Sequence, residues 1–530
     1  MLDEFHSHMQ NGTWKLVPPS GDPVIDSKWI LTRKPDRLKA RLVARGFTAV
    51  PGVHYFETFS PVPRLTSFRI LMALAGPMKL RLRQFDVKTA FLQARFTEGE
   101  TIHMRQPQHF VQEGKEDWTC LLQRPIYGLP QAPRAWNKRL VSELKRLGFQ
   151  TQQQRADPCV FVLKQDNDLA ITIVWVDDFI MATNSEMLDI KMRDQLQATF
   201  DMRDMGAPKV FAGMEIQQTD QGIYVTQSTL INELVGEFGM LEANPRSTPM
   251  DDAKLFKCEQ DDEICSTEEE RQYRHGVGVN LFLNNTRPDI SFAVSQLSKF
   301  ISQPGKQHFQ ALKQLLRYLK GTQHLGIFYP SEGSCKLECY VDASWASDPN
   351  DGRSVTGYVY LLNGSPISWS SKKQATVAKS TSEAEFYAMS GAASEGAWIL
   401  QFLQQVGFGS FETNQIQMLE DNQGAEKFAT NPIAHPGLRQ VGVHHLFIRE
   451  MIEDGLVQLQ HVASEENIAD VCTKPLAKTK FLKFREKLRM DQKLMRIRDK
   501  EEAANSVETK SGACQTKHSQ GASPLLYLLI

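Results

Sequence analysis

Two adjacent carboxylates at the end of an apolar run place the strongest constraint on how this chain can fold. Residues 169–176 (LAITIVWV) have the pattern of a buried strand, and Asp177 and Asp178 follow it directly. Burying a charged carboxylate is costly, and a second negative charge beside it raises the pKa of one acid unless a cation lies between them. A divalent cation such as Mg²⁺, which prefers carboxylate oxygens, removes both costs. The alternative is a plain hairpin turn, since Asp is common in turns.

A third acid indicates what such a pair could do. Asp86 lies at the end of another strand-like segment, RQFDV (residues 83–87). Three carboxylates on two neighbouring strand ends can hold two Mg²⁺ ions about 4 Å apart. That arrangement activates an attacking 3′-hydroxyl and stabilises a pyrophosphate leaving group. The pattern therefore favours nucleotidyl transfer.

The chain of 530 residues is long enough for about three domains. We expect an α+β multidomain protein with a first block at residues 11–250, which mixes strands and helices. A connecting region at residues 251–334 is expected to lead to a third block, an α/β domain at residues 335–476. Residues 490–530 are expected to form a disordered tail. The connecting region begins with nine acids and two lysines in residues 251–270, which predict an exposed linker.

Apolar spacing predicts the main elements. Helices are expected at residues 66–75, 134–147, 308–320 and 383–406, the last capped within 380–382. Strands are expected at residues 159–164, 169–176, 336–341, 357–362 and 366–369. The first two strands form a hairpin across residues 165–168, and Gly321 ends the third helix.

Composition excludes several classes. No apolar run approaches the roughly 18 residues that a membrane span needs. The eight cysteines include no CxxC pair, which argues against zinc ribbons and a disulfide framework and indicates a reducing, intracellular compartment. The net charge is −1, but residues 28–45 carry seven basic residues and one Asp, a cluster suited to binding phosphates.

A second set of acids is spread over the third block. Asp342 follows a predicted strand, Asp421 and Asp470 come later, and Glu383 and Glu385 begin the long helix. Four such carboxylates could converge into a cluster suited to two-metal phosphodiester hydrolysis. The alternative is that they are unrelated surface acids.

Five motifs in order give the first block a family resemblance: KARLVARGF (39–47), ETFSPV (57–62), FDVKTAFL (85–92), YGLPQAPRAW (127–136) and WVDD (175–178). The set closely resembles the reverse transcriptase of copia-type LTR retrotransposons. YVDASWASD (340–348), PISWSSKKQ (366–374), STSEAEFY (380–387), EDNQ (420–423) and NIADV (467–471) resemble the RNase H domain of the same elements. Residues 273–274, 285–290 and 316–322 resemble the region that connects the two.

The resemblance implies a right-hand polymerase with palm, fingers and thumb, followed by a connecting region and an RNase H-like domain. Asp86, Asp177 and Asp178 match the metal ligands of the polymerase. Each active site is expected to use two Mg²⁺ ions, with Mn²⁺ as an alternative. A cytoplasmic particle or the nucleus is the expected location.

Four further residues match nucleotide contacts of the family. Phe91 matches the aromatic gate that excludes a 2′-hydroxyl, although a core Phe explains it equally well. Gln131 matches a residue that lies against the incoming nucleotide. Lys39 and Arg41 resemble the fingers cations that neutralise the triphosphate; the alternative is that they are surface charges on a hairpin.

In the third block the resemblance implies that Asp342, Asp421 and Asp470 are metal ligands, together with one acid of the long helix. Related domains carry a Glu-x-x-Ala pattern. Because EFYA (385–388) fits it, we prefer Glu385 to Glu383.

The expected function is copying an RNA template into DNA from a DNA primer and dNTPs, then hydrolysing the RNA of the RNA–DNA hybrid. Other element-encoded proteins are expected partners, and a membrane is not. The alternative is a decayed remnant that only binds nucleic acid, because Trp175 replaces the usual Tyr and the hairpin between Trp29 and Lys39 is short. A cellular or telomerase-like polymerase is less well supported, because the connecting and RNase H motifs are those of a retrotransposon.

Overall fold

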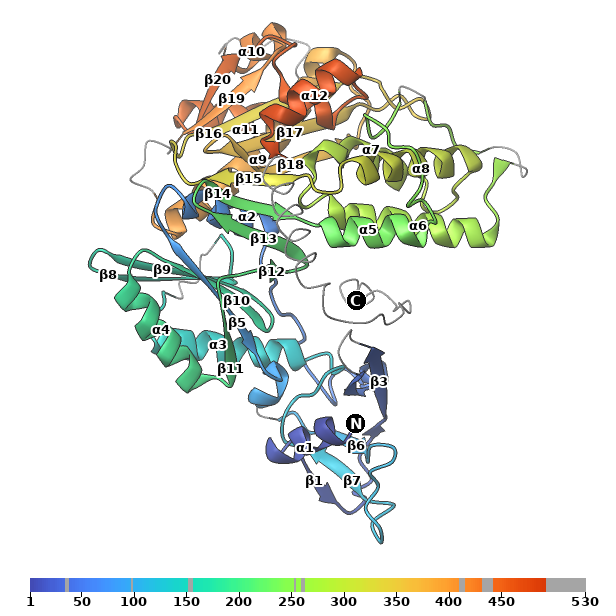
Figure 1. Cartoon of the computed structure of the whole chain (residues 1–530), viewed down its shortest axis with the longest axis vertical. Helices are drawn as coiled ribbons and strands as arrows, with labels where there is room; N and C mark the ends of the chain where they lie inside the picture. Colours follow the sequence, from blue (N-terminus) through green and yellow to red (C-terminus); the bar gives the residue numbers. More distant parts are fainter. Residues whose placement is uncertain are drawn as a thin grey trace, which may run out of the picture.

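The computed structural model describes residues 1–33, 38–96, 99–150, 156–251, 254–258, 263–408, 415–430 and 442–491. Its helices and strands form a mixed α/β protein, which confirms the expected class at that level (Figure 1). Within these ranges no helix has both the length and the apolar character to cross a membrane. The predicted tail lies outside the described residues from position 492 on, as do residues 34–37 of the hairpin predicted to be short.

The N-terminal part lies at one end of the molecule and the third block at the other (Figure 1). It contains helix α1 (Leu2–Gln10) and a sheet of order β1-β7-β6-β2, made of β1 (Trp14–Val17), β7 (Thr119–Leu122), β6 (His103–Arg105) and β2 (Val24–Ile25). A separate hairpin pairs β3 (Ser27–Arg33) with β4 (Leu38–Ala44). The short 3₁₀ helices η1 (Gly46–Thr48) and η2 (Ala90–Gln93) belong to the same half of the chain.

A central five-stranded sheet carries the first acids. Its order is β11 (Met202–Gly206), β5 (Arg81–Val87), β10 (Asp178–Thr183), β9 (Asp168–Trp175) and β8 (Val160–Gln165). The predicted hairpin of β8 and β9 is confirmed. The helices of this part are α2 (Leu65–Ala75), α3 (Ala132–Arg146) and α4 (Glu186–Thr199), and the first two match the predicted helices to within two residues.

A third sheet joins the first block to the last residues described. Its order is β12 (Val210–Phe211), β13 (Met214–Thr219), β14 (Gly222–Thr226), β15 (Gly326–Pro330) and β21 (Met490–Asp491). Its neighbours in the chain are α5 (Ser228–Glu237), α6 (Thr267–Leu283), η4 (Pro288–Ile290), α7 (Ser291–Ser298) and α8 (Lys306–Gly321). The four leucines of α8 (Leu312, Leu315, Leu316 and Leu319) are all buried, and the helix ends at Gly321, as predicted.

Hydrogen bonds hold part of the acidic segment in place, whereas the sequence predicts an exposed linker. Residues 254–258 form neither helix nor strand, as expected, but hydrogen bonds fix them from two sides. His308 Nε2 donates to the Phe256 carbonyl at 2.9 Å, and Asn350 Nδ2 donates to the Leu255 carbonyl at 3.0 Å. The expected linker therefore continues into packed structure, and α6 begins at Thr267 behind a capping box formed by Ser266 and Glu269.

The third block is built on a mixed sheet of order β18-β17-β16-β19-β20. Its strands are β18 (Ser365–Lys373), β17 (Val355–Leu362), β16 (Leu337–Ser344), β19 (Ile416–Glu420) and β20 (Val457–His461). The accompanying helices are α9 (Thr381–Gln405), α10 (Gln423–Thr430), α11 (Gly442–Glu453), η6 (Ile468–Cys472) and α12 (Lys478–Lys487). Two predicted strand ends were wrong. Pairing with β17 extends β16 three residues further, past Asp342, and extends β18 to Lys373.

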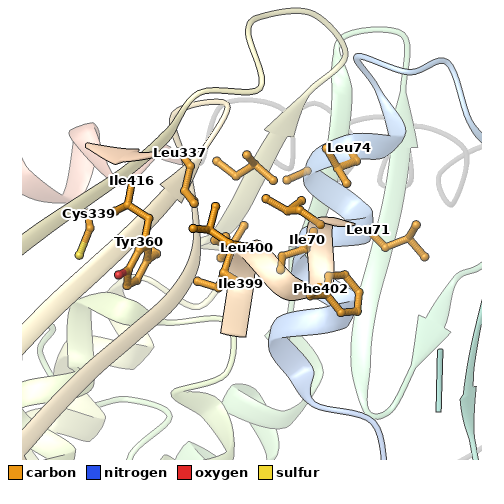
Figure 2. Packing of buried hydrophobic residues seen from close by; sticks show 14 of the residues in the cluster. Ile70, Leu71, Leu74, Leu337, Cys339, Tyr360, Ile399, Leu400, Phe402 and Ile416 are labelled. Atoms are coloured by element: carbon orange, nitrogen blue, oxygen red, sulfur yellow. The ribbon is translucent and has the colours of Figure 1, made fainter. Parts of the chain in front are cut away.

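One apolar core runs from α2 of the first block into the third block. Figure 2 shows Ile70, Leu71 and Leu74 of α2 close to Leu400 and Phe402 of α9, and all five belong to the same buried cluster. Burial of these side chains is the main stabilising term, at about 25 cal/mol for each Å² of apolar surface removed from water. The first and third blocks therefore share a core.

Candidate active sites

The Asp-Asp pair lies on a tight hairpin turn between β9 and β10. Trp175 and Asp178 are cross-strand partners, so Val176 and Asp177 form a two-residue loop. Val176 has a φ of 58°, a conformation that is strained for a β-branched residue and usually belongs to Gly at this position of a hairpin. Trp136 Nε1 donates to the Val176 carbonyl at 2.6 Å, and the Val87 amide donates to the Asp177 carbonyl at 2.8 Å. The turn and the metal-site interpretations of the pair are therefore compatible.

The third predicted acid lies next to this turn. Asp86 of β5 is directly opposite Asp178 of β10 in the sheet register, which places the two side chains on one face. Gln84 Nε2 donates both to Asp178 Oδ1 and to the Val210 carbonyl, at 2.8 Å each. This amide fixes one Asp178 oxygen, so the orientation of the carboxylate is set by the β12–β13 hairpin as well as by its own strand.

The negative charges of these carboxylates favour a bound cation. Burial, with the charges of Asp177 and Asp86, raises the pKa of Asp178 to about 7, although the Gln84 hydrogen bond lowers it. Burial likewise raises the pKa of Asp177, which the positive charges of Arg41 and Lys39 lower. The two acids with raised pKa values, with Asp86 beside them, offer carboxylate oxygens of the kind that a hard divalent ion prefers.

The predicted nucleotide contacts surround the same acids. Lys39 and Arg41 lie on β4 close enough to influence Asp177, and the Arg41 guanidinium lies 5.5 Å from the centroid of the Tyr127 ring. Phe91 is 8% exposed and its ring meets Tyr127 edge-on at 4.8 Å. Both the gate and the core interpretation of Phe91 remain compatible with this position.

Gln131 is almost completely buried where α3 begins. Its Nε2 donates to the His54 carbonyl at 3.1 Å, while its Oε1 has no hydrogen-bond partner among the described residues. Its predicted role beside a nucleotide stays a prediction.

A second acidic site lies in the third block. Asp342 lies within β16, Glu385 in the first turns of α9, and Asp421 directly after β19. One carboxylate oxygen from each lies within 4.8 Å of the other two, a spacing that suits a shared metal ion, whereas Asp86, Asp177 and Asp178 do not approach one another this closely. Burial raises the pKa of Asp342 to about 6. Burial, reinforced by Glu420 and Asp342, raises the pKa of Glu385 well above its ordinary value.

The structure separates the two alternatives on α9. Glu385 is 5% exposed, and its Oε2 has no hydrogen-bond partner among the described residues. Glu383 instead accepts a hydrogen bond from the Lys379 amide at 2.7 Å, just before the helix N-cap at Ser380. The geometry therefore places Glu385, and not Glu383, in the acidic group.

The fourth predicted acid is held differently. Asp470, in η6, is 1% exposed and is not part of the three-acid group. Lys474 Nζ lies 2.6 Å from its Oδ1, and Lys480 Nζ lies 2.8 Å from its Oδ2. Neither lysine was predicted from the sequence. Lys480 reaches the site from α12, a helix outside the recognised motifs.

Two more residues of this site were missed. Glu420 is 1% exposed, and its Oε2 lacks a hydrogen-bond partner in the described ranges. The signal existed, because Glu420 and Asp421 are adjacent acids after the strand-like, mostly apolar segment IQML (416–419), much like the pattern that pointed to the first site. The Thr473 hydroxyl donates to Asp342 Oδ2 and fixes that carboxylate. Unpartnered, buried carboxylate oxygens fit a divalent cation here.

Comparison with known proteins decides the family. Residues 11–252 match the family model described as reverse transcriptase (RNA-dependent DNA polymerase). A putative transposon Ty5-1 protein of Saccharomyces cerevisiae is 33% identical over 305 residues, which cover 57% of this chain and 96% of that protein. The Pol polyprotein of the Arabidopsis thaliana transposon RE1 is 36% identical over 496 residues, or 92% of this chain. The chain belongs to the copia-type retrotransposon Pol family.

This Pol chain spans 33% of the length of the RE1 polyprotein. Among solved structures, the foamy viral protease–reverse transcriptase in complex with double-stranded DNA is similar at a TM-score of 0.25 and 13% identity, over 89% of this chain and 70% of that one. Membership of the Pol family confirms the resemblance drawn from the five motifs of the first block. The roles of individual site residues stay predictions.

Proposed function

We propose that this Pol chain is an RNA-directed DNA polymerase with an associated RNase H activity. The observation that carries the proposal is the pairing of Asp86 with Asp178 across β5 and β10, beside the turn that presents Asp177. Two basic residues, Lys39 and Arg41, lie near the same acids. Membership of the Pol family and the match of residues 11–252 to a reverse transcriptase model support the polymerase assignment.

The proposed layout follows the sheets. The central sheet β11-β5-β10-β9-β8 corresponds to the palm, the β3–β4 hairpin with the N-terminal sheet to the fingers, and helices after β14 to the thumb and the connection. The β18-β17-β16-β19-β20 sheet with α9 corresponds to the RNase H-like domain. The proposed domains are residues 11–250, 251–334 and 335–476. The shared apolar core joins the first of these domains to the last.

In the proposed polymerase step, this chain's residues position the catalytic carboxylates and neutralise the charge of the dNTP. Gln84 orients Asp178, and the bonds from Trp136 and Val87 hold the turn that carries Asp177. Lys39 and Arg41 offset the charge of the dNTP triphosphate. Bound Mg²⁺, or Mn²⁺ in its place, would lower the pKa of the primer 3′-hydroxyl and stabilise the leaving pyrophosphate.

In the proposed hydrolytic step, Asp342, Glu385 and Asp421 hold the cation, and Thr473 fixes the orientation of Asp342. The substrate would be the RNA strand of an RNA–DNA hybrid. One ground for the decayed-remnant alternative is Trp175, whose ring packs against the apolar core. Because the neighbouring hairpin keeps its register, this substitution leaves the acids in place.

Primer extension tests the proposal. The full chain should extend a DNA primer on an RNA template in the presence of Mg²⁺, and Asp177→Asn should abolish extension without unfolding the protein. A hybrid-cleavage assay with Asp342→Asn tests the second activity separately. Well-folded wild-type protein that binds hybrid but performs neither reaction would establish the remnant alternative.

A further inference from the structure

Asp470 differs from the other acids of the third-block site in its surroundings. Asp342, Glu385 and Asp421 present oxygens to one another, whereas each oxygen of Asp470 faces its own lysine. The carboxylate is 1% exposed, so these two ammonium groups, whose side chains are 39% and 23% exposed, provide most of its charge compensation. Asp470 is therefore already neutralised by the protein.

The lysine between the acids is Lys474. Its Nζ lies 2.6 Å from Asp470 Oδ1 and 3.6 Å from Asp342 Oδ2. An ordinary lysine is charged at neutral pH, since its pKa is about 10.4. The ammonium group of Lys474 therefore places a positive charge between Asp342 and Asp470.

The protein holds this arrangement through the backbone. The Lys474 amide donates to the Asp470 carbonyl at 3.2 Å, which fixes the spacing of the pair. Lys480, at the start of α12, donates to the Ser464 carbonyl at 3.1 Å as well as pairing with Asp470. A divalent ion bound between Asp342 and Asp470 would therefore meet the ammonium groups of Lys474 and Lys480, and like charges repel strongly at such distances.

We propose that the ammonium group of Lys474 takes the place of the second divalent cation, so that the third-block site binds a single metal ion through Asp342, Glu385 and Asp421. This inference departs from the two ions expected from the sequence. It deepens the proposed RNase H function by making Lys474 a fixed cation of the site. The number of bound ions does not itself depend on hybrid cleavage.

The test counts Mn²⁺ ions on the full chain by isothermal titration and by electron paramagnetic resonance. Asp86→Asn, Asp177→Asn and Asp178→Asn are introduced together to remove binding at the first site. This background protein should bind one Mn²⁺ ion, and adding Asp342→Asn should abolish that binding. Adding Lys474→Gln, which removes the charge and keeps most of the side chain, should raise the count to two.

Matched variants separate charge from fold. Lys483→Gln removes a cation on the same helix as Lys480, where it pairs with Glu466 and not with Asp470, and should leave one ion bound. Asp470→Asn should also leave one ion with unchanged affinity, and this measurement decides the matter if Lys474→Gln does not fold. Two ions in the background protein, one ion after Lys474→Gln, or loss of the ion with Asp470→Asn would each overturn the inference. The expected counts without hybrid cleavage would overturn the proposed function alone.

Discussion

The guanidinium carbon of Arg69 lies 4.1 Å from the centroid of the Trp369 ring, and this contact joins helix α2 of the first block to strand β18 of the third. Arg69 also donates to the carbonyls of Asn285 and Ile367, at 3.0 and 3.1 Å. Burial lowers its pKa to about 10, so it stays charged at neutral pH. One side chain therefore connects the first block, the connecting region and the third block.

Replacement of Arg69 by Ala should destabilise both blocks at once. Each of the two buried carbonyls left without a donor costs about 1–3 kcal/mol. Urea unfolding followed by fluorescence and by circular dichroism should show one earlier, common transition. Arg64→Ala is the matched control, because the Arg64 guanidinium covers Trp398 from a more exposed position and should cost less. Two separate transitions in the wild-type protein would contradict a shared core.

Replacement of Val176 by Gly should raise the stability of the protein and lower its polymerase activity. Relief of the left-handed conformation gains about 1–2 kcal/mol, and the extra freedom of Gly in the unfolded chain returns about 0.5–1 kcal/mol. Thermal unfolding should therefore shift slightly upward, and primer extension should fall because the turn that carries Asp177 becomes less rigid. Asp166→Gly, at another positive φ in the exposed β8–β9 turn, should change neither property. A lower melting temperature for Val176→Gly would show that the strain is absent.

Replacement of Trp136 by Phe removes the indole donor and keeps an aromatic ring in the core. Loss of the bond to the Val176 carbonyl should cost about 1 kcal/mol in stability. Because Asp177 then loses part of its support, the extension rate should fall about ten- to a hundredfold. Trp398→Phe removes a similar bond, from Nε1 to the Ala156 carbonyl at 2.9 Å, and should lower stability without affecting extension. Equal rate losses for both variants would point to a general effect on folding.

Asp348 gives a prediction about acid stability. Burial opposes its ionisation, but Lys299 and the Asn350 amide outweigh burial and hold the pKa of Asp348 well below its usual range. A lowered folded-state pKa means that the stabilisation is complete above the unfolded pKa of about 3.9 and is lost as the pH falls below it. Asp348→Asn should therefore cost about 2–5 kcal/mol at pH 7 and much less near pH 2.

Urea unfolding at both pH values measures this difference. Lys373 Nζ lies 3.2 Å from Asp348 and 2.8 Å from Asp351. Asp351→Asn is the control, because Asp351 is the more exposed of the two acids and its loss should have a smaller effect. A deficit for Asp348→Asn that is equal at both pH values would exclude the ion pair as its cause.

Local patterns were enough to predict most elements and the nearness of Asp86 to the Asp177–Asp178 turn. The helix α8 and the β8–β9 hairpin before Asp177 depend on residues near one another in the chain, and both are confirmed. The position of Asp342 within β16 was not predictable in this way, because the strand is extended by pairing with β17. Likewise, Lys480 meets Asp470 only through the packing of α12. Contacts between distant segments leave no periodic signal in the sequence.

The pairing of β21 with β15 has a consequence for synthesis on the ribosome. Gly326 and Ile327 of β15 pair with Asp491 and Met490, and the Phe328 amide donates to the Arg489 carbonyl. Until the last of these residues leaves the ribosome, β15 presents an open edge to which other chains can add. Domains fold from the N-terminus during translation, so the first block waits with this edge unprotected while the third block is made. A nascent chain stalled before residue 491 would thus be prone to aggregate, and the emergence of residues 489–491 is what closes this edge of the sheet.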